Sequence, residues 1–327
     1  MSLNVIGLEE HMATDEVFTA WRRHDPHLLD EPVMRWTVDG TASAPLLDLG
    51  DDRLQAMDIA GVDTAVLSLT TPGLQNLPAA EAVALQGPTN DVIADAVRRH
   101  ADRFQGWATL ATPDPAAAAA ELERAITRLG LSGAMLHARS GADFLDAPRF
   151  WDIFAVAEHH RAPLYLHPSL PTAAVDDAYY RGFGMLGSGA IGWHYQTGIV
   201  LMRMILAGVF DRFPHLQIVV GHWGEVVLFY LERAAVLDRD SGLQRPVLDY
   251  FRHNVHVTPG GIASHRYLNW AVDVLGVDRI MHATDYPFNG PHDFAAREFL
   301  TAAHLSDDDR SKIAALNWER LREGIRR

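Results

Sequence analysis

A carboxylate and an imidazole lie two residues apart near the start of the chain. Residues 4–12 read Asn-Val-Ile-Gly-Leu-Glu-Glu-His-Met, an apolar run that predicts a buried strand with polar groups at its C-terminal end. Because side chains alternate across a strand, Glu9 and His11 share one face and Glu10 takes the other. Such a pair can bind a divalent cation, although a hydrogen-bonded couple at the mouth of a barrel is an alternative interpretation.

Three more polar residues end apolar runs of the same kind. These residues, each with the strand that it ends, are His167 (163–167), His222 (216–222) and Asp285 (279–285). If Asp285 points into the interior of a barrel, alternation places His282 on the opposite face, where a structural role is favoured.

The other histidines are weighed by position. His137 also ends a predicted strand, 133–137, and competes for a place at the site. His256 lies early in the predicted strand 255–258 and is expected to be packed against its neighbours. Seven histidines in predicted loops or helices are expected to face solvent: His24, His27, His100, His159, His160, His215 and His304.

Two imidazoles and two carboxylates that converge on one point suit a borderline divalent cation such as Zn2+ or Mn2+. The predicted ligands are Glu9, His11, His167 and Asp285, which leave coordination positions open for water or substrate. His222 is then free for proton transfer, and Glu225, three residues later, can fix its tautomer and raise its basicity. A second interpretation of Glu225, as a helix-start carboxylate that favours the helix dipole, is compatible with the first.

Eight short apolar strands alternate with helical segments along the chain. The predicted strands cover residues 4–12, 64–69, 104–110, 133–137, 163–167, 216–222, 255–258 and 279–285. The predicted helices cover residues 51–60, 79–100, 116–129, 148–159, the segment from 193 to near 210, 223–237, 293–304 and 307–321. Two stretches without clear periodicity, 12–50 and 168–192, are predicted to be insertions over the mouth of the fold.

This alternation predicts an α/β fold with parallel strands. A count of eight strands favours closure into a (β/α)8 TIM barrel with insertions over its C-terminal face. An open doubly wound sheet is the alternative, but the first turn from strand to helix lacks a glycine-rich phosphate-binding fingerprint. Without an internal repeat or linker, residues 1–327 are predicted to form a single domain.

Composition excludes several classes of protein. The net charge of −14 argues against non-specific binding to nucleic acid or to an anionic membrane surface. The chain has no cysteine, which excludes disulfides and thiolate chemistry. No signal-like start and no apolar run of about 18 residues is present, so a soluble, cytoplasmic protein is predicted.

Several motifs occur in an order typical of one family. They are Leu8-Glu9-Glu10-His11, Val66-Leu67-Ser68, Pro72-Gly73-Leu74-Gln75, Pro163-Leu164-Tyr165-Leu166-His167-Pro168, Gly208-Val209-Phe210-Asp211-Arg212-Phe213-Pro214, Gly221-His222-Trp223-Gly224-Glu225 and Asp285-Tyr286-Pro287-Phe288. Through them the chain resembles the metal-dependent decarboxylase branch of the amidohydrolase superfamily. This branch contains γ-resorcylate, 2,3-dihydroxybenzoate and 2-amino-3-carboxymuconate-6-semialdehyde decarboxylases, and the Glu-x-His start is similar to the resorcylate type.

The resemblance implies roles for particular residues. It implies a metal on Glu9, His11, His167 and Asp285, with His222 and Glu225 as the proton-handling pair. It implies that Arg233 supports the site or a subunit contact, and that the chain forms a homodimer or homotetramer. Two departures leave the substrate open: Gln196 stands where relatives often have Glu, and Asn289 where an acidic residue is common.

The predicted activity is non-oxidative decarboxylation of a small hydroxylated aromatic or enol-type carboxylic acid. Asp285 or the pair His222 and Glu225 would protonate the ring carbon. The predicted walls for a planar substrate, each of which could also be core packing, are Trp193, Tyr286 and Phe288. The same metal could instead activate water for hydrolysis of a lactone or amide, or for hydration of an enol acid, with His222 as base. A non-enzymatic binding protein on a barrel scaffold is the third hypothesis.

Overall fold

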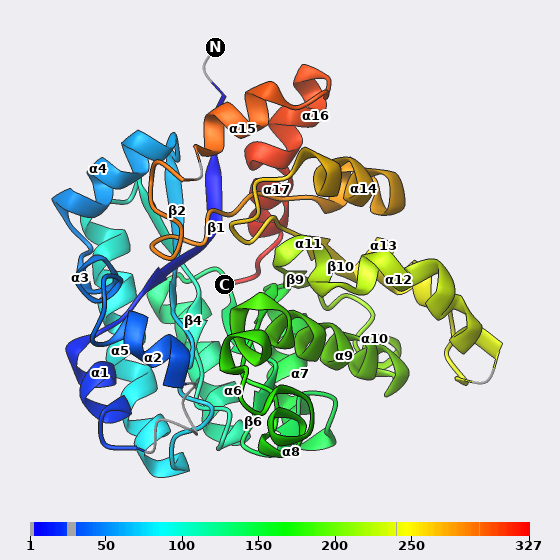
Figure 1. Cartoon of the computed structure of the whole chain (residues 1–327), viewed down its shortest axis with the longest axis horizontal. Coiled ribbons are helices and arrows are strands. Elements are labelled where there is room, and N and C mark those ends of the chain that lie inside the picture. Colours follow the sequence, from blue (N-terminus) through cyan, green and yellow to red (C-terminus); the bar gives the residue numbers. More distant parts are fainter. Residues whose placement is uncertain (1–2, 25–30, 240, 294) are drawn as a thin grey trace.

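A ring of strands occupies the centre of the molecule and helices surround it (Figure 1). The computed structural model describes residues 3–24, 31–239, 241–293 and 295–327. The strands of the ring are β1 (Ile6–Met12), β2 (Thr64–Leu69), β3 (Phe104–Gly106), β4 (Ala108–Thr109), β5 (Ala134–His137), β8 (Leu164–His167), β9 (Ile218–Val220) and β10 (Val255–Val257). A short hairpin of β6 (Arg139–Ser140) and β7 (Asp143–Phe144) lies beside them.

The strands pair in parallel in two runs, β1-β2-β3 and β10-β9-β8-β5-β4. Between β3 and β4 the chain stays in the ring, because the backbone N–H of Trp107 donates to Leu67 O at 2.8 Å. On the other side residues 280–286 connect β10 to β1: Met281 N donates to Val257 O at 2.9 Å and Leu8 N to His282 O at 3.0 Å. The predicted (β/α)8 TIM barrel is therefore confirmed.

The predicted strand 279–285 is wrong in detail. Single bridges join Val257 to Ile280 and Glu10 to Tyr286, and no regular strand lies between them in this described segment. Asp285 has a φ of 62°, and this left-handed conformation turns the chain out of the ladder. Its N–H still donates to Glu9 O at 3.0 Å, so the segment closes the barrel and places Asp285 at the mouth.

Helices cover the outside of the ring. The longer ones are α4 (Asp51–Ala60), α5 (Ala79–Arg99), α6 (Pro115–Arg124), α7 (Trp151–His160), α9 (Gly192–Leu206), α12 (Val227–Ala234), α13 (Val247–Asn254), α14 (His265–Leu275), α15 (Ala296–Ala302) and α17 (Asn317–Glu323). The short ones are α8 (Ala173–Val175), α10 (Val209–Arg212), α11 (His222–Glu225) and α16 (Asp307–Ser311). Single 3-10 or π turns cover Ala125–Leu129, Pro148–Phe150, Asp176–Tyr180, Leu186–Ala190, Ala235–Arg239, Val277–Arg279 and Lys312–Leu316.

Most predicted helices are confirmed with small shifts of their ends. Helix α4 spans the predicted residues and ends at Gly61, which has a φ of 73°. Asp48, three residues before the helix, accepts from the N–H of Arg53 at 2.6 Å and so satisfies one group of the first turn. Helices α13 and α14 were not predicted from the sequence.

The first insertion is more regular than its sequence indicates. It contains α1 (Asp15–Trp21), α2 (Glu31–Thr37) and α3 (Ser43–Leu47). Thr14 caps α1 by accepting from Val17 N at 3.3 Å, and Val17 and Phe18 are buried beneath it. Helices of five to seven residues are too short to show a helical period, so their sequence gives a weak signal.

Side chains of alternate strand positions fill the barrel. Leu8, Trp107, Tyr165 and Met281 belong to one buried cluster, which also contains Ala283. Positions 281 and 283 therefore face the interior of the barrel. The ring of His282 instead lies 6.4 Å from the ring of Phe299 on α15, on the helix side of the wall. None of the described helices combines the length and apolar character needed to cross a bilayer.

Candidate metal centre and active site

The four side chains predicted as ligands meet at the C-terminal end of the barrel. Glu9 and His11 end β1, His167 is the last residue of β8, and Asp285 lies in the closing segment. The Nε2 atom of His167 lies 3.1 Å from Glu9 Oε1. The Nε2 atom of His11 lies 3.3 Å from Asp285 Oδ1 and 3.9 Å from Glu9 Oε1. The ligand atoms therefore face one point, as the sequence predicts.

Two of these atoms have no hydrogen-bond partner within the part of the chain that the structure describes. They are Glu9 Oε1 and His11 Nε2, both buried, and such groups are costly to leave unpaired. His11 Nδ1 lies 3.1 Å from Ser68 Oγ and His167 Nδ1 lies 2.9 Å from Pro168 O, so both rings direct Nε2 to the cluster. This donor set fits a divalent cation whose histidine ligands are oriented by second hydrogen bonds.

Burial and mutual charge control protonation in the cluster. Burial alone would raise the pKa of Glu9, but the charges of His222 and His167 bring it well below its usual range. Burial lowers the pKa of His11 to about 3 and keeps its ring neutral, the form that binds metals. Burial and the charge of Glu9 raise the pKa of Asp285.

A second cluster lies beside the first. Glu225 is fully buried between two imidazoles, with Oε1 2.8 Å from His222 Nδ1 and Oε2 3.0 Å from His194 Nδ1. His222 directs its other nitrogen, Nε2, toward Glu9 Oε1 at 3.9 Å. Burial alone would lower the pKa of His222, but the charges of Glu225 and Glu9 raise it to about 10. The contact with Glu225 therefore favours the protonated form of His222, whose Nε2 atom faces the predicted metal ligands.

A left-handed turn brings His222 and Glu225 together. The predicted helix 223–237 begins only at Val227, because residues 222–226 all have positive φ values, between 48° and 85°. Such conformations cost energy for residues other than glycine and persist where surrounding contacts stabilise them. Trp223 supplies two such contacts: its backbone N–H donates to Thr258 O at 2.9 Å and its ring N–H to Ile262 O at 2.8 Å.

Helix α9 packs closely on this turn. A Cβ atom at Gly198 would lie 2.3 Å from Glu225 O, so only glycine allows the approach. His194 lies one turn earlier on α9 and reaches Glu225 from there. Its Nε2 atom lies 3.0 Å from Gly189 O, so both ring nitrogens of His194 face acceptors.

A cavity of about 320 Å³ opens above the two clusters. His11, His167, His222 and Asp285 contribute to its floor, and Trp193 and Phe288 contribute aromatic walls, as predicted. Asn289 also lines the cavity and donates to Thr284 O at 3.2 Å.

Two residues predicted to bind substrate do not line this cavity. Tyr286 is absent from the described lining, and its ring packs against the guanidinium of Arg53 at 4.7 Å. Arg233 is exposed on α12 and reaches none of the described cavities of this single chain. The left-handed conformation of Asp285 precedes Tyr286, and Arg233 is exposed in the single chain, so contact of either residue with substrate stays a prediction.

The structure also shows where other residues singled out in the sequence lie. The ring of His137 lies 5.3 Å from that of His167, so His137 borders the cluster at the end of β5. Gln196 is buried on α9 without lining the cavity. His160 was predicted to face solvent but is buried, with Nε2 2.6 Å from Glu123 Oε2. His27 lies outside the described residues.

Sequence reasoning missed His194 and the residues that orient the ligands. His194 is a single histidine within a helix, and nothing in its spacing separates it from surface histidines. Tyr165 donates from its hydroxyl to Glu9 Oε2, and it lies two residues before His167 on the same face of β8. The alternation of strand side chains could have predicted this contact.

Carboxylates and imidazoles at the C-terminal ends of a (β/α)8 barrel are typical of metal-dependent barrel enzymes. The chain belongs to the amidohydrolase family, because the family model described as Amidohydrolase matches residues 27–321. The resemblance inferred from the motifs is thereby confirmed.

Individual relatives extend this result. The chain is 34% identical over 328 residues to the γ-resorcylate decarboxylase of Rhodococcus jostii strain RHA1, a match that covers 95% of this chain and 96% of the relative. The crystal structure of 5-carboxyvanillate decarboxylase from Sphingomonas paucimobilis has a TM-score of 0.92 at 35% identity, covering 98% of this chain and 99% of that one. The dihydroxybenzoic acid decarboxylase of Polaromonas sp. JS666, solved with manganese and the inhibitor 2-nitroresorcinol, has a TM-score of 0.87 at 29% identity, covering 99% and 97%.

Proposed function

We propose that this protein is a metal-dependent, non-oxidative decarboxylase of hydroxylated aromatic acids. The observation that carries the proposal is the meeting of His11, His167 and Asp285 on the floor of a cavity of about 320 Å³, with the carboxylate of Glu9 buried directly beneath them. The protonated His222 lies beside this floor. The relatives are named for decarboxylation of γ-resorcylate, 5-carboxyvanillate and dihydroxybenzoate, which are hydroxylated aromatic acids.

The cation is held by the four converging side chains. Manganese in the Polaromonas relative supports Mn2+, and the donors of Glu9, His11 and His167, with Asp285 beside His11, are equally compatible with Zn2+. When bound, the cation supplies a Lewis acid for the carboxylate and the neighbouring hydroxyl of the substrate.

His222 is the proposed proton donor. A carboxylate that holds a cation is deprotonated, so Asp285 cannot act as ligand and acid at the same moment. His222 carries a proton, and Glu225 holds the ring through Nδ1 and leaves the Nε2–H directed at the cavity. The proton adds to the ring carbon that bears the carboxylate. The bond to the carboxylate then breaks, CO2 leaves, and its electron pair restores the aromatic ring.

The same geometry disfavours the hydrolase or hydratase alternative. A base on water must be unprotonated, whereas the contact of His222 Nδ1 with the buried carboxylate of Glu225, at 2.8 Å, favours the protonated imidazole. Trp193 and Phe288 offer flat walls that suit an aromatic ring rather than an extended amide.

The test is release of CO2 from a panel of acids by protein loaded with Mn2+ or Zn2+. We expect turnover of 2,6-dihydroxybenzoate, 2,3-dihydroxybenzoate or 5-carboxyvanillate, and none of benzoate, which lacks the neighbouring hydroxyl. Chelation of the metal should abolish turnover, and His222→Gln should reduce kcat by about 10²–10⁴ while the metal content stays unchanged. Turnover of no hydroxylated acid, together with hydrolysis of a lactone or amide, would overturn the proposal.

Three further features belong to this proposal. The chain is proposed to act as a single barrel domain over residues 1–327 in the cytoplasm, as a homodimer or homotetramer. Exposed Arg233 is then a candidate for a subunit contact rather than for substrate binding in its own chain. Light scattering of the parent and Arg233→Ala proteins tests the assembly and this contact.

A further inference from the structure

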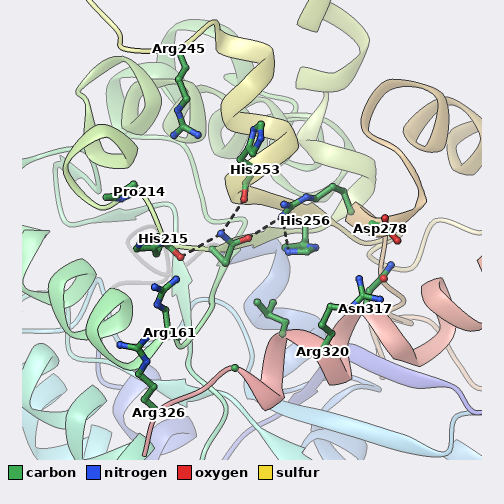
Figure 2. Close-up of a pocket in the computed structure, with 14 residues that line it drawn as sticks. Arg161, Pro214, His215, Arg245, His253, His256, Asp278, Asn317, Arg320 and Arg326 are labelled. Atoms are coloured by element: carbon green, nitrogen blue, oxygen red, sulfur yellow. Dashed lines mark hydrogen bonds between the residues drawn. The ribbon is translucent and has the colours of Figure 1, made fainter.

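A second cavity lies at the opposite end of the barrel from the metal cluster. Its volume is about 770 Å³, and its lining includes residues that precede strands together with residues of α17 and of the segment that follows it (Figure 2). Arg161 precedes β8, Gln217 precedes β9, and His253 precedes β10. The predicted metal ligands lie at the C-terminal ends of the strands, so the two cavities do not share residues.

This cavity is strongly cationic in a chain that is acidic as a whole. Its lining contains one carboxylate, Asp278, and five arginines: Arg161, Arg245, Arg279, Arg320 and Arg326. With the histidines neutral, the lining therefore carries a net charge of +4, against −14 for the chain. Asp278 is itself paired with Lys312, at 3.0 Å.

The five arginines have no carboxylate partner among the residues that the structure describes. Arg279 donates to Gln217 Oε1 and His256 Nε2, both at 3.0 Å, and Arg245 donates to Asn254 Oδ1 at 3.0 Å. These are neutral acceptors. Other arginines, such as Arg124 and Arg297, form ion pairs with acidic side chains. Unneutralised guanidinium groups that gather from several elements indicate an anionic ligand.

His256 gives an independent indication. It is 6% exposed and lines the cavity. Because a guanidinium has only donors, His256 Nε2 must accept from Arg279, which places the proton of the neutral ring on Nδ1. That Nδ1 has no partner within the described chain, so a buried N–H is left without an acceptor. An oxygen of an anion would satisfy it.

We propose that this cavity binds a small organic anion with two phosphate groups. The arginines line the space from different sides: Arg245 lies at the top of the view, Arg161 lies below it, and Arg320 belongs to α17 (Figure 2). This spread suits two phosphates better than one, and two phosphate monoesters carry about −3 to −4 at neutral pH, which matches the charge of the lining. The volume of about 770 Å³ accommodates a phosphorylated sugar.

The test is calorimetric titration of the metal-loaded protein with fructose 1,6-bisphosphate at low salt, where screening is weak. We expect one saturable site per chain, and binding at least about tenfold weaker for glucose 6-phosphate, which has one phosphate. The variant Arg320→Gln/Arg326→Gln should also weaken binding at least about tenfold. Both of these side chains are exposed, so the variant is expected to fold, and far-UV circular dichroism verifies this.

The matched control is Arg266→Gln, which removes the same charge from an exposed position on α14 outside the cavity. Its affinity should equal that of the parent. The proposal is overturned if fructose 1,6-bisphosphate shows no saturable binding, if glucose 6-phosphate binds equally well, or if the double variant binds like the parent. Metal content is measured before and after each titration, so that loss of the cation is not mistaken for binding.

Discussion

Replacement of Glu225 by glutamine is expected to shift the pH dependence of decarboxylation toward acid. The variant keeps a group of the same shape between His222 and His194 but removes its charge. His222 must be protonated to give its proton to the substrate, so activity is present below the pKa of His222 and is lost as pH rises through it. Lowering that pKa moves the alkaline limb of the pH–rate profile toward acid.

The size of the shift follows from the geometry. His222 Nδ1 and Glu225 Oε1 are 2.8 Å apart, and Glu225 is fully buried. Two unit charges about 4 Å apart gain about 4 kcal/mol at an effective dielectric constant of about 20, which equals about 3 pKa units. The loss of this interaction from a pKa of about 10 leaves His222 near its ordinary range. A bound cation lowers the pKa of His222 in parent and variant alike, so the difference between them is the quantity to measure.

The assay is kcat/KM for CO2 release from pH 5 to 10 by metal-loaded parent and variant. We expect an alkaline limb about 2–3 pH units lower in the variant, with most of the activity retained near pH 6. The control is Glu232→Gln, an exposed carboxylate on α12 that makes the same charge change away from the site. An alkaline limb that does not move, in a variant with full metal content, would refute the assignment of His222 as the acid.

Three further predictions test the site and its supports. Ser68→Ala removes the contact to His11 Nδ1 and should weaken Mn2+ binding by about 10–100-fold in an equilibrium metal titration. Gly198→Ala places a Cβ atom 2.3 Å from Glu225 O and should lower the free energy of unfolding, measured in urea, by about 1–3 kcal/mol. The control is Gly87→Ala on α5, where the atom nearest to the new Cβ is 3.9 Å away, and it should raise the free energy of unfolding by about 0.5–1 kcal/mol. Burial and the charge of Arg279 lower the pKa of His256 from 6.5 to about 3, so the unfolded chain binds more protons below pH 6.5 and stability is lost as pH falls from there toward 3. Between pH 7 and 5.5 the parent should therefore lose about 1 kcal/mol more than His256→Gln, and equal losses would contradict the buried neutral ring.

The barrel and its ligands could be predicted because they depend on local patterns. Apolar runs that end in polar residues mark the C-terminal ends of buried strands, and parallel closure brings those ends to one face. The alternation of side chains along a strand then assigns each residue to the inner or the outer side of the barrel. Asp285 and Met281 accordingly face the interior, and His282 faces the helices. The strand period and the closure of the barrel together bring close residues as distant in sequence as Glu9 and Asp285.

The failures occur where contacts between elements override local preference. The run His222 to Val226 has no proline, and its sequence predicts a helix start, yet all five residues adopt positive φ. Tyr286 was expected at the mouth because it follows Asp285, but the left-handed conformation of Asp285 redirects it against Arg53. Neither outcome is visible in residues 222–226 or 285–286 alone, because both depend on partners elsewhere in the chain.

The strained turn and the close approach of α9 have one chemical consequence. In a regular helix that began at residue 223, Glu225 would continue along the helix. The left-handed turn instead folds the carboxylate of Glu225 back against His222 Nδ1. Gly198 then allows α9 to approach closely enough for His194 to bind the second oxygen of the same carboxylate. Because both oxygens of the buried Glu225 are occupied by imidazole nitrogens, its charge stays fixed beside the proposed acid, and the cost of the turn is offset by that interaction.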